Sequence, residues 1–208
     1  MTTWMVFKLA RRGGTLPASS LLLAGVVLNA ILSAGILALT FIVDPTRMFG
    51  MMYWLLGTVT PVSGWSLAGT VALAAFLIGA LVAQAPKLNL LSLGDEAALS
   101  LGLEVERFKT TLLFSVALMM SVVVAVSGLI GFVGIMIPHV LRMVLGPDHR
   151  LLLPASALAG AGFLVLADTA ARTLLAPTEM PVGVLTALCG GPFFLYLLRT
   201  THGRWLPK

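Results

Sequence analysis

Six long apolar segments, separated by short polar turns, dominate this chain of 208 residues. Most of them approach or exceed about 20 residues, the length that a helix needs to cross a bilayer. Every backbone polar group in lipid must find a partner within the protein, so such segments fold as α-helices. The sequence therefore predicts an all-α fold, a polytopic bundle of transmembrane helices. The predicted spans cover roughly residues 17–43, 64–85, 108–127, 129–145, 151–175 and 181–198.

The composition excludes several classes of protein. The chain is 59% hydrophobic and 10% charged, whereas about 25% of the residues in soluble domains are charged. Its mean hydropathy is +1.03. The cations are dispersed between apolar blocks and form no stripe that a nucleic-acid backbone would require. The single Cys189 excludes an intrachain disulfide, and we expect neither a metal site nor a cofactor.

Two details of the apolar pattern refine the expected bundle. The fourth span is short and contains Gly131, Gly134 and Pro138, so we expect it to be broken or kinked. Residues 45–57 are apolar and aromatic but too short to cross a membrane. They are typical of a helix that lies at the external interface.

The segment 92–103 is the most unusual of the polar connections. Asp95 and Glu96 open a short Ala/Leu helix, where the helix dipole favours acidic residues. The segment falls on the cytoplasmic side, between the second and third predicted spans. It could dock onto a soluble partner, and a solvated turn is the alternative reading. The apolar side chains available for docking are Ala97, Ala98, Leu99 and Leu101.

The lysines and arginines predict how the chain is oriented in the membrane. When six spans are threaded, all of the 13 cationic residues except Arg47 and Arg172 fall on one side. Cytoplasmic segments of membrane proteins carry the excess of positive charge. We therefore expect both termini in the cytoplasm. The residues on that side are Lys8, Arg11, Arg12, Lys87, Arg107, Lys109, Arg142, Arg150, Arg199, Arg204 and Lys208.

Charged residues also occur within the predicted spans. Asp168 and Arg172 are four residues apart, so they can pair across one helical turn near the external end of the fifth span. His139 and Arg142 follow Pro138, where they can bond to carbonyls that the proline frees or extend to the cytoplasmic face.

Two acidic residues lie in the polar turns on either side of the fifth span. Asp148, in the turn GPDHR (146–150), is most simply a turn and helix-start residue, and contact with a soluble partner is the alternative. Glu179, in the turn APTEMP (176–181), is either solvated or a minor docking contact.

From Leu21 onward the chain resembles the permease subunits of type II ABC importers, which carry iron–siderophores, haem or cobalamin. The resemblance rests on six blocks in the order and spacing of that family. They are SSLLLAGVVLNAI (19–31), MMYWLLG (51–57), LSLGDEAALSLGL (91–103), GFVGIMIPHVLRMVLGPDHRLLLP (131–154), LADTAARTL (166–174) and PVGVLTALCGGPFFLYLL (181–198).

The resemblance implies a larger fold and an assembly of several subunits. The family fold has about ten membrane helices of about 20 residues each, and the chain resembles the last six. We therefore expect residues 1–208 to form a single transmembrane permease domain without the N-terminal helices. The partners implied are an ATP-binding cassette ATPase subunit, a periplasmic or lipid-anchored substrate-binding protein, a second permease copy or homologue, and membrane lipid.

The resemblance also assigns roles to individual residues. Arg172 matches an external arginine that, in the family, forms a salt bridge to a glutamate of the binding protein and so docks it. Asn29 and Ser33 lie in a span that matches a helix lining the translocation pathway. The segment 92–103 matches a cytoplasmic coupling helix that contacts the ATPase, and the coupling residues are Gly94, Asp95, Glu96, Ala97, Ala98, Leu99 and Gly102.

The expected function is that of an ABC importer permease for such chelates, in the bacterial inner membrane. The sequence holds no GxxxxGK[ST] loop, so ATP hydrolysis is expected in a partner and the chain is not expected to be an enzyme. An ion-coupled secondary transporter and a non-functional truncated fragment are the alternatives. An intramembrane enzyme is disfavoured because Asp168 has no acidic partner nearby and His139 has no second histidine.

Overall fold

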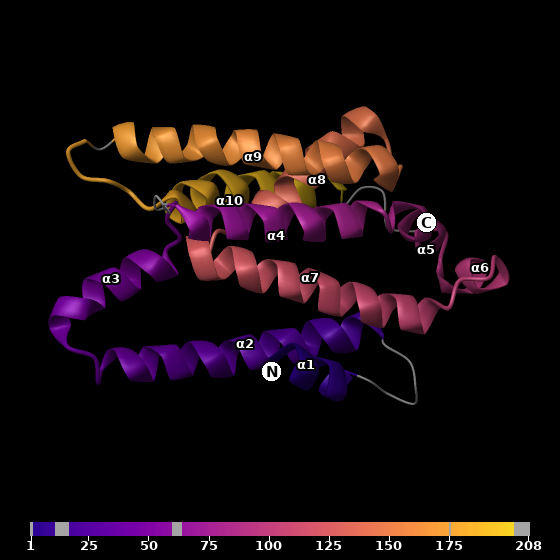
Figure 1. The fold of residues 1–208 in the computed structure, drawn as a ribbon, viewed down its shortest axis with the longest axis horizontal. Helices are drawn as coiled ribbons and strands as arrows, with labels where there is room; N and C mark the ends of the chain where they lie inside the picture. Colours follow the sequence, from indigo (N-terminus) through magenta and orange to yellow (C-terminus); the bar gives the residue numbers. More distant parts are fainter. Residues whose placement is uncertain (1, 11–16, 60–63, 175, 202–208) are drawn as a thin grey trace. The chain divides into compact units, whose positions relative to one another are not determined.

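The computed structural model describes residues 2–10, 17–59, 64–174 and 176–201, and the regular elements in these ranges are all α-helices (Figure 1). The predicted all-α class is confirmed. In chain order the helices are α1 (Thr2–Ala10), α2 (Ala18–Thr40), α3 (Pro45–Leu55), α4 (Trp65–Val82), α5 (Ala85–Leu91), α6 (Asp95–Ser100), α7 (Val105–Ser127), α8 (Val133–Leu145), α9 (His149–Thr173) and α10 (Val182–Thr201).

Each of the six predicted spans coincides with one helix to within four residues at either end. In the described part of the chain, however, only α2, α7 and α9 are long and apolar enough to span a membrane alone. Helices α4 and α5 meet at a bend of 46°, and as one bent span they would add a fourth. Helix α8 has 13 residues, about 20 Å of helix against about 30 Å of hydrocarbon. The number of six spans therefore stays a prediction.

The fourth predicted span is helical only from Val133 onward. Helix α8 runs without interruption from Val133 to Leu145 with Pro138 inside, and residues 129–132 of the predicted span, which include Gly131, are not helical. A bend of 46° separates α4 from α5 just before Pro86, where the second predicted span ends. Proline has no N–H to bond to the carbonyl of Val82, and its ring crowds that carbonyl. The Gln84 side chain caps this end by donating to the Ala80 carbonyl at 3.2 Å.

The chain folds as two compact units, of which the first comprises Met1–Met51 and Leu90–Met120. Within it, α1 packs beside α2 (Figure 1). The rings of Phe7 and Phe114 meet at a centroid distance of 5.7 Å and join α1 to α7. Helix α2 carries exposed leucine, valine and isoleucine side chains along its length. A helix that is apolar all round is typical of a membrane span.

The second unit comprises Met52–Asn89 and Ser121–Lys208. Within it, α9 packs against α8, α10 and α4, and α8 also contacts α10 (Figure 1). The buried residues include Leu77, Leu152, Ala167, Ala171 and Val182. Thr186 is buried as well, and its hydroxyl donates to the Gly183 carbonyl at 3.0 Å, which satisfies the polar group within the helix.

Large apolar side chains remain exposed on most of the long helices. Soluble monomers rarely expose large contiguous apolar patches. In a bilayer the same surface faces lipid or a neighbouring helix, where burial of a polar group would be costly. The distribution of exposed side chains therefore agrees with an integral membrane protein.

Candidate functional site

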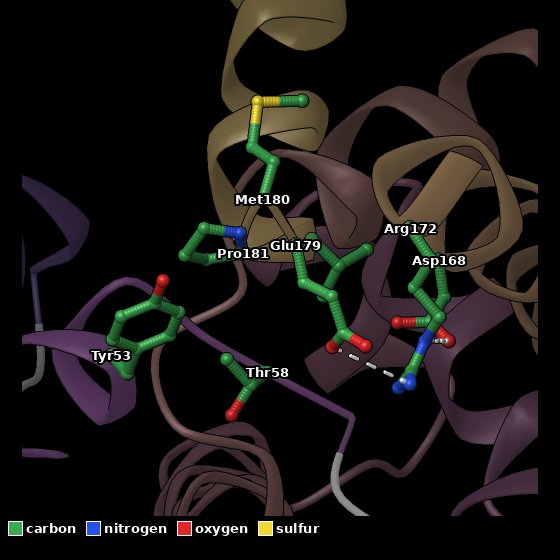
Figure 2. A pocket seen from close by; sticks show the side chains of 8 residues that line it. Tyr53, Thr58, Asp168, Arg172, Glu179, Met180 and Pro181 are labelled. Atoms are coloured by element: carbon green, nitrogen blue, oxygen red, sulfur yellow. Dashed lines mark hydrogen bonds and ion pairs between the residues drawn. The ribbon is translucent and has the colours of Figure 1, made fainter. Parts of the chain in front are cut away.

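Arg172, at the end of α9, is the centre of a charged cluster in the second unit (Figure 2). Its Nε donates to Asp168 Oδ2 at 2.8 Å, which confirms the predicted pairing across one turn. Its Nη2 donates to the backbone carbonyl of Val59 at 2.7 Å. Its Nη1 faces Glu179 Oε2 at 3.8 Å. The cluster therefore joins α9 to the segment after α3 and to the turn before α10.

The cluster lines a pocket of about 180 Å³. Sites for drug-sized ligands usually have about 300–1,000 Å³. The pocket is thus large enough for one side chain of a partner but too small for a whole metal chelate. The residues that line it are Tyr53, Thr58, Asp168, Arg172, Glu179, Met180, Pro181 and Val182.

Backbone hydrogen bonds hold the walls of this pocket in place. The Thr58 N–H donates to the Ser127 carbonyl at 2.9 Å, and the Met180 N–H donates to the Ala171 carbonyl at 3.3 Å. Gly183, in the first turn of α10, lies so close to the Leu56 carbonyl that a Cβ at this position would collide with it. The absence of a side chain therefore permits the close approach of α10 to this loop.

The charges in the pocket do not balance. One guanidinium faces two carboxylates, so the cluster carries a formal excess of negative charge. The Asp168 side chain is 23% exposed and that of Glu179 is 67% exposed. Exposed ion pairs contribute about 1 kcal/mol or less. Because Asp168 is the less exposed carboxylate, its ion pair with Arg172 is the stronger of the two, and the contact with Glu179 is weak.

The second candidate site is the short helix α6, in the first unit. Gly94 precedes it at φ 102° and Gly102 follows it at φ 85°, both in the region that favours glycine. The Leu103 N–H donates to the Ala98 carbonyl at 3.0 Å, and the Gly102 N–H donates to the Leu99 carbonyl at 2.9 Å. This pair of bonds is the Schellman motif, which ends the helix sharply. The predicted short helix between two glycines is present.

The surface of α6 differs from the one expected on sequence grounds. Ala98 is 0% exposed, so it anchors the helix and offers no contact to a partner. Leu99 is 58% exposed, and Leu93 and Leu101 beside it are exposed as well. Asp95 accepts a hydrogen bond from Lys109 Nζ at 2.6 Å, which ties the start of α6 to α7. Glu96 and Gly94 are exposed, and Ala97 is half-buried.

A third cluster, centred on Asn89 in α5, was not predicted. Asn89 Nδ2 donates to Asp148 Oδ1 at 2.6 Å, and Asn89 Oδ1 accepts from the His149 backbone N–H at 2.9 Å. The His149 Nδ1 also lies 2.7 Å from that oxygen. Asp148 Oδ1 accepts from the Arg150 N–H at 2.9 Å, so its predicted role as a helix-start residue is confirmed. No local pattern relates Asn89 to residues 59 and 60 positions away.

The hydrogen bonds at Asp148 affect its protonation. The backbone N–H of Arg150 lowers the pKa of the Asp148 carboxyl, and the amide of Asn89 lowers it further. The carboxylate therefore remains ionised and keeps its capping role at neutral pH.

The remaining residues singled out by the sequence are dispersed. Asn29 and Ser33 lie exposed one turn apart on α2. The His139 ring meets the Phe193 ring edge-on at 6.3 Å. Arg11, Arg12, Arg204 and Lys208 lie outside the described residues. Among the residues that the structure describes, no three His, Cys, Asp or Glu side chains gather as a metal site would require.

Comparison with known proteins relates the chain to membrane permeases. The model of the FecCD transport family matches residues 1–200. The hemin transport system permease protein HmuU of Yersinia pestis is 46% identical over 93% of this chain and 58% of its own length. The cobalamin import system permease protein BtuC of Halobacterium salinarum is 42% identical over 99% of this chain and 55% of its own. The chain thus spans a little over half the length of these relatives.

The fold has a close match among solved structures. A chain described as an inward-facing conformation of a metal-chelate type ABC transporter superposes with a TM-score of 0.84 at 32% sequence identity. The match covers 95% of this chain and 63% of the other.

Proposed function

Because this chain belongs to the FecCD transport family, whose model covers residues 1–200, we propose that it is the membrane-spanning permease subunit of an ABC importer. Its cargo is an iron–siderophore, haem or cobalamin-type chelate. The family consists of transport subunits, not enzymes. The work of transport therefore comes from ATP hydrolysis in a separate subunit.

The likeness of fold to the metal-chelate type transporter carries this proposal, since it extends over 95% of the chain at a TM-score of 0.84. Two relatives above 40% identity are named as hemin and cobalamin permeases, which supports a tetrapyrrole or related chelate as cargo. The pocket at Arg172 is too small for such a cargo. The path of the chelate must lie elsewhere, and we assign Asn29 and Ser33 to it.

We assign the contact with the ATP-binding subunit to α6. An exposed surface of Leu93, Leu99 and Leu101 can insert between side chains of a soluble partner. Such a helix-in-groove contact depends on apolar anchors that are free on the helix surface. Ala98 beneath them and the Lys109–Asp95 bond make the helix a firm element that can transmit movement.

We assign the contact with the substrate-binding protein to Arg172. Arginine is well suited to this role because its planar guanidinium recognises carboxylates. In the six-span topology that the lysines and arginines predict, both chain termini and α6 lie on the cytoplasmic side of the membrane. In the same prediction Arg172 lies on the external side. Two permease copies enclose the pathway.

The experiment is ATP-driven uptake into proteoliposomes. The permease is reconstituted with its ATP-binding subunit and substrate-binding protein, and labelled hemin and labelled cobalamin are offered separately. We expect uptake of one of them with ATP, and none when the ATPase carries a substitution of its catalytic glutamate. Uptake that follows a proton or sodium gradient without ATP would identify a secondary transporter instead.

A further inference from the structure

We propose that Glu179 occupies the place of the partner's carboxylate at Arg172 and leaves it when the substrate-binding protein docks. This inference rests on the proposed docking role of Arg172 and adds a regulatory element to it. The acceptor of the docking bond is a carboxylate of the binding protein, and Glu179 competes with it.

The geometry of the guanidinium identifies the contested position. Arginine offers donors on Nε, Nη1 and Nη2. Nε and Nη2 are engaged at 2.8 and 2.7 Å by Asp168 and by the Val59 carbonyl. Nη1 lies 3.8 Å from Glu179, beyond the usual limit of about 3.2 Å for such a bond. Nη1 is therefore the nitrogen at which a new carboxylate can form a better bond than the present one.

The two acidic residues differ in how easily they can leave. Asp168 is on the same helix as Arg172, one turn away, and is 23% exposed. Glu179 is in the turn before α10 and is 67% exposed. A well-exposed side chain in a turn can rotate into water at little cost. Figure 2 shows both carboxylates beside the guanidinium. Glu179 can therefore be displaced, whereas Asp168 holds the guanidinium in position.

The net charge of the pocket determines how the displacement of Glu179 changes the binding of a partner's carboxylate. Asp168 alone neutralises Arg172, and Glu179 then makes the site negative. An incoming carboxylate meets like charge, which is unfavourable at an interface. Once Glu179 turns away, the site is neutral and its 180 Å³ admit one acidic side chain. Glu179 thus weakens non-specific binding of acidic proteins at this pocket. It favours a partner that makes other contacts with the permease as well.

The test is the affinity of the binding protein for the permease in nanodiscs, measured with Glu179→Gln. The probe is the purified substrate-binding protein that supports ATP-driven uptake in proteoliposomes. We expect about two- to fivefold tighter binding, the range of an exposed ion pair, and a smaller gain in high salt. In an Arg172→Gln background the same substitution should change nothing.

Asp44→Asn is the matched control, because it removes one negative charge from the same predicted side of the membrane. The Asp44 carboxylate accepts its hydrogen bonds from Thr46, two residues away. It should leave the affinity unchanged. If Glu179→Gln leaves the affinity unchanged or weakens it, while Arg172→Glu abolishes binding, the placeholder role is wrong and the docking role stands. If Arg172→Glu has no effect either, both are wrong.

Discussion

Arg172 Nη2 donates to the backbone carbonyl of Val59 at 2.7 Å, across 113 residues of the chain. The arginine for which we propose a docking role therefore also holds the loop after α3 against the end of α9. A substitution at Arg172 removes a structural bond as well as a charge. Experiments at this site have to separate the two effects.

We expect Arg172→Glu to weaken docking of the binding protein by roughly 30-fold or more, because breaking a well-placed interface charge costs about 2–5 kcal/mol. Loss of the bond to the Val59 carbonyl should cost about 1–3 kcal/mol of stability. Affinity in nanodiscs and thermal stability in detergent measure the two separately. Arg172→Lys keeps the charge but not the planar fork, so it should recover part of the affinity. If the loss of folded protein accounts for the whole loss of binding, the role of Arg172 is purely structural.

We expect Asn89→Leu to loosen the start of α9. The substitution removes a bond to the Asp148 carboxylate and an acceptor for the His149 N–H, at a cost of about 1–3 kcal/mol. The thermal midpoint of the purified protein should fall by several degrees. Gln84→Leu is the control, because it removes only a bond within one helix end and should have a smaller effect.

The cap at Asp148 predicts a dependence of stability on pH. Its pKa lies below the ordinary value of 3.8 because the Arg150 N–H and the Asn89 amide stabilise the carboxylate. The stabilisation is present above that ordinary value and is lost as the pH falls through the lower pKa of the folded state. Thermal midpoints between pH 6 and pH 3, approximate bounds for an aspartate titration, should decline more steeply in the wild type than in Asp148→Asn. Parallel curves would contradict the assignment.

We expect Gly183→Ala to destabilise the second unit. The added Cβ would collide with the Leu56 carbonyl, and backbone that must move costs about 1–3 kcal/mol. Gly191→Ala, in the same helix, is the control because nothing lies within 4 Å of its added Cβ. Folded yield and thermal midpoint should fall for the first variant and stay near the wild-type values for the second. The opposite order would mean that α10 does not approach the loop so closely.

The sequence predicted features that depend on local pattern. Helix positions follow from apolar blocks, the Asp168–Arg172 pair from their spacing of four, and the cap at Asp148 from its place in a turn. The glycines around α6 likewise indicated a short helix. Each of these is decided within a few residues, so the printed chain contains the information.

Other features depend on which distant segments meet. No periodicity relates Asn89 to His149 or Arg172 to the Val59 carbonyl, because these bonds arise from tertiary packing. The burial of Ala98 depends on which residues pack over α6. The sequence alone therefore could not distinguish Ala98 from the exposed residues beside it. The bend before Pro86 has a local signal, because proline interrupts the hydrogen bonding of a helix, and the second predicted span ends at residue 85. The sequence analysis did not predict the helix α5 that follows.

The central claim is that α6 links a separate ATPase to this permease, and Leu99→Arg tests it most directly. Leu99 is the suitable position because it is 58% exposed, whereas the neighbouring Ala98 is buried and a larger side chain there would disturb the packing. ATP-driven uptake in proteoliposomes is measured together with association of the ATP-binding subunit. We predict that Leu99→Arg loses both while inserting and folding as the wild type does. Normal association and uptake by that variant would contradict the claim.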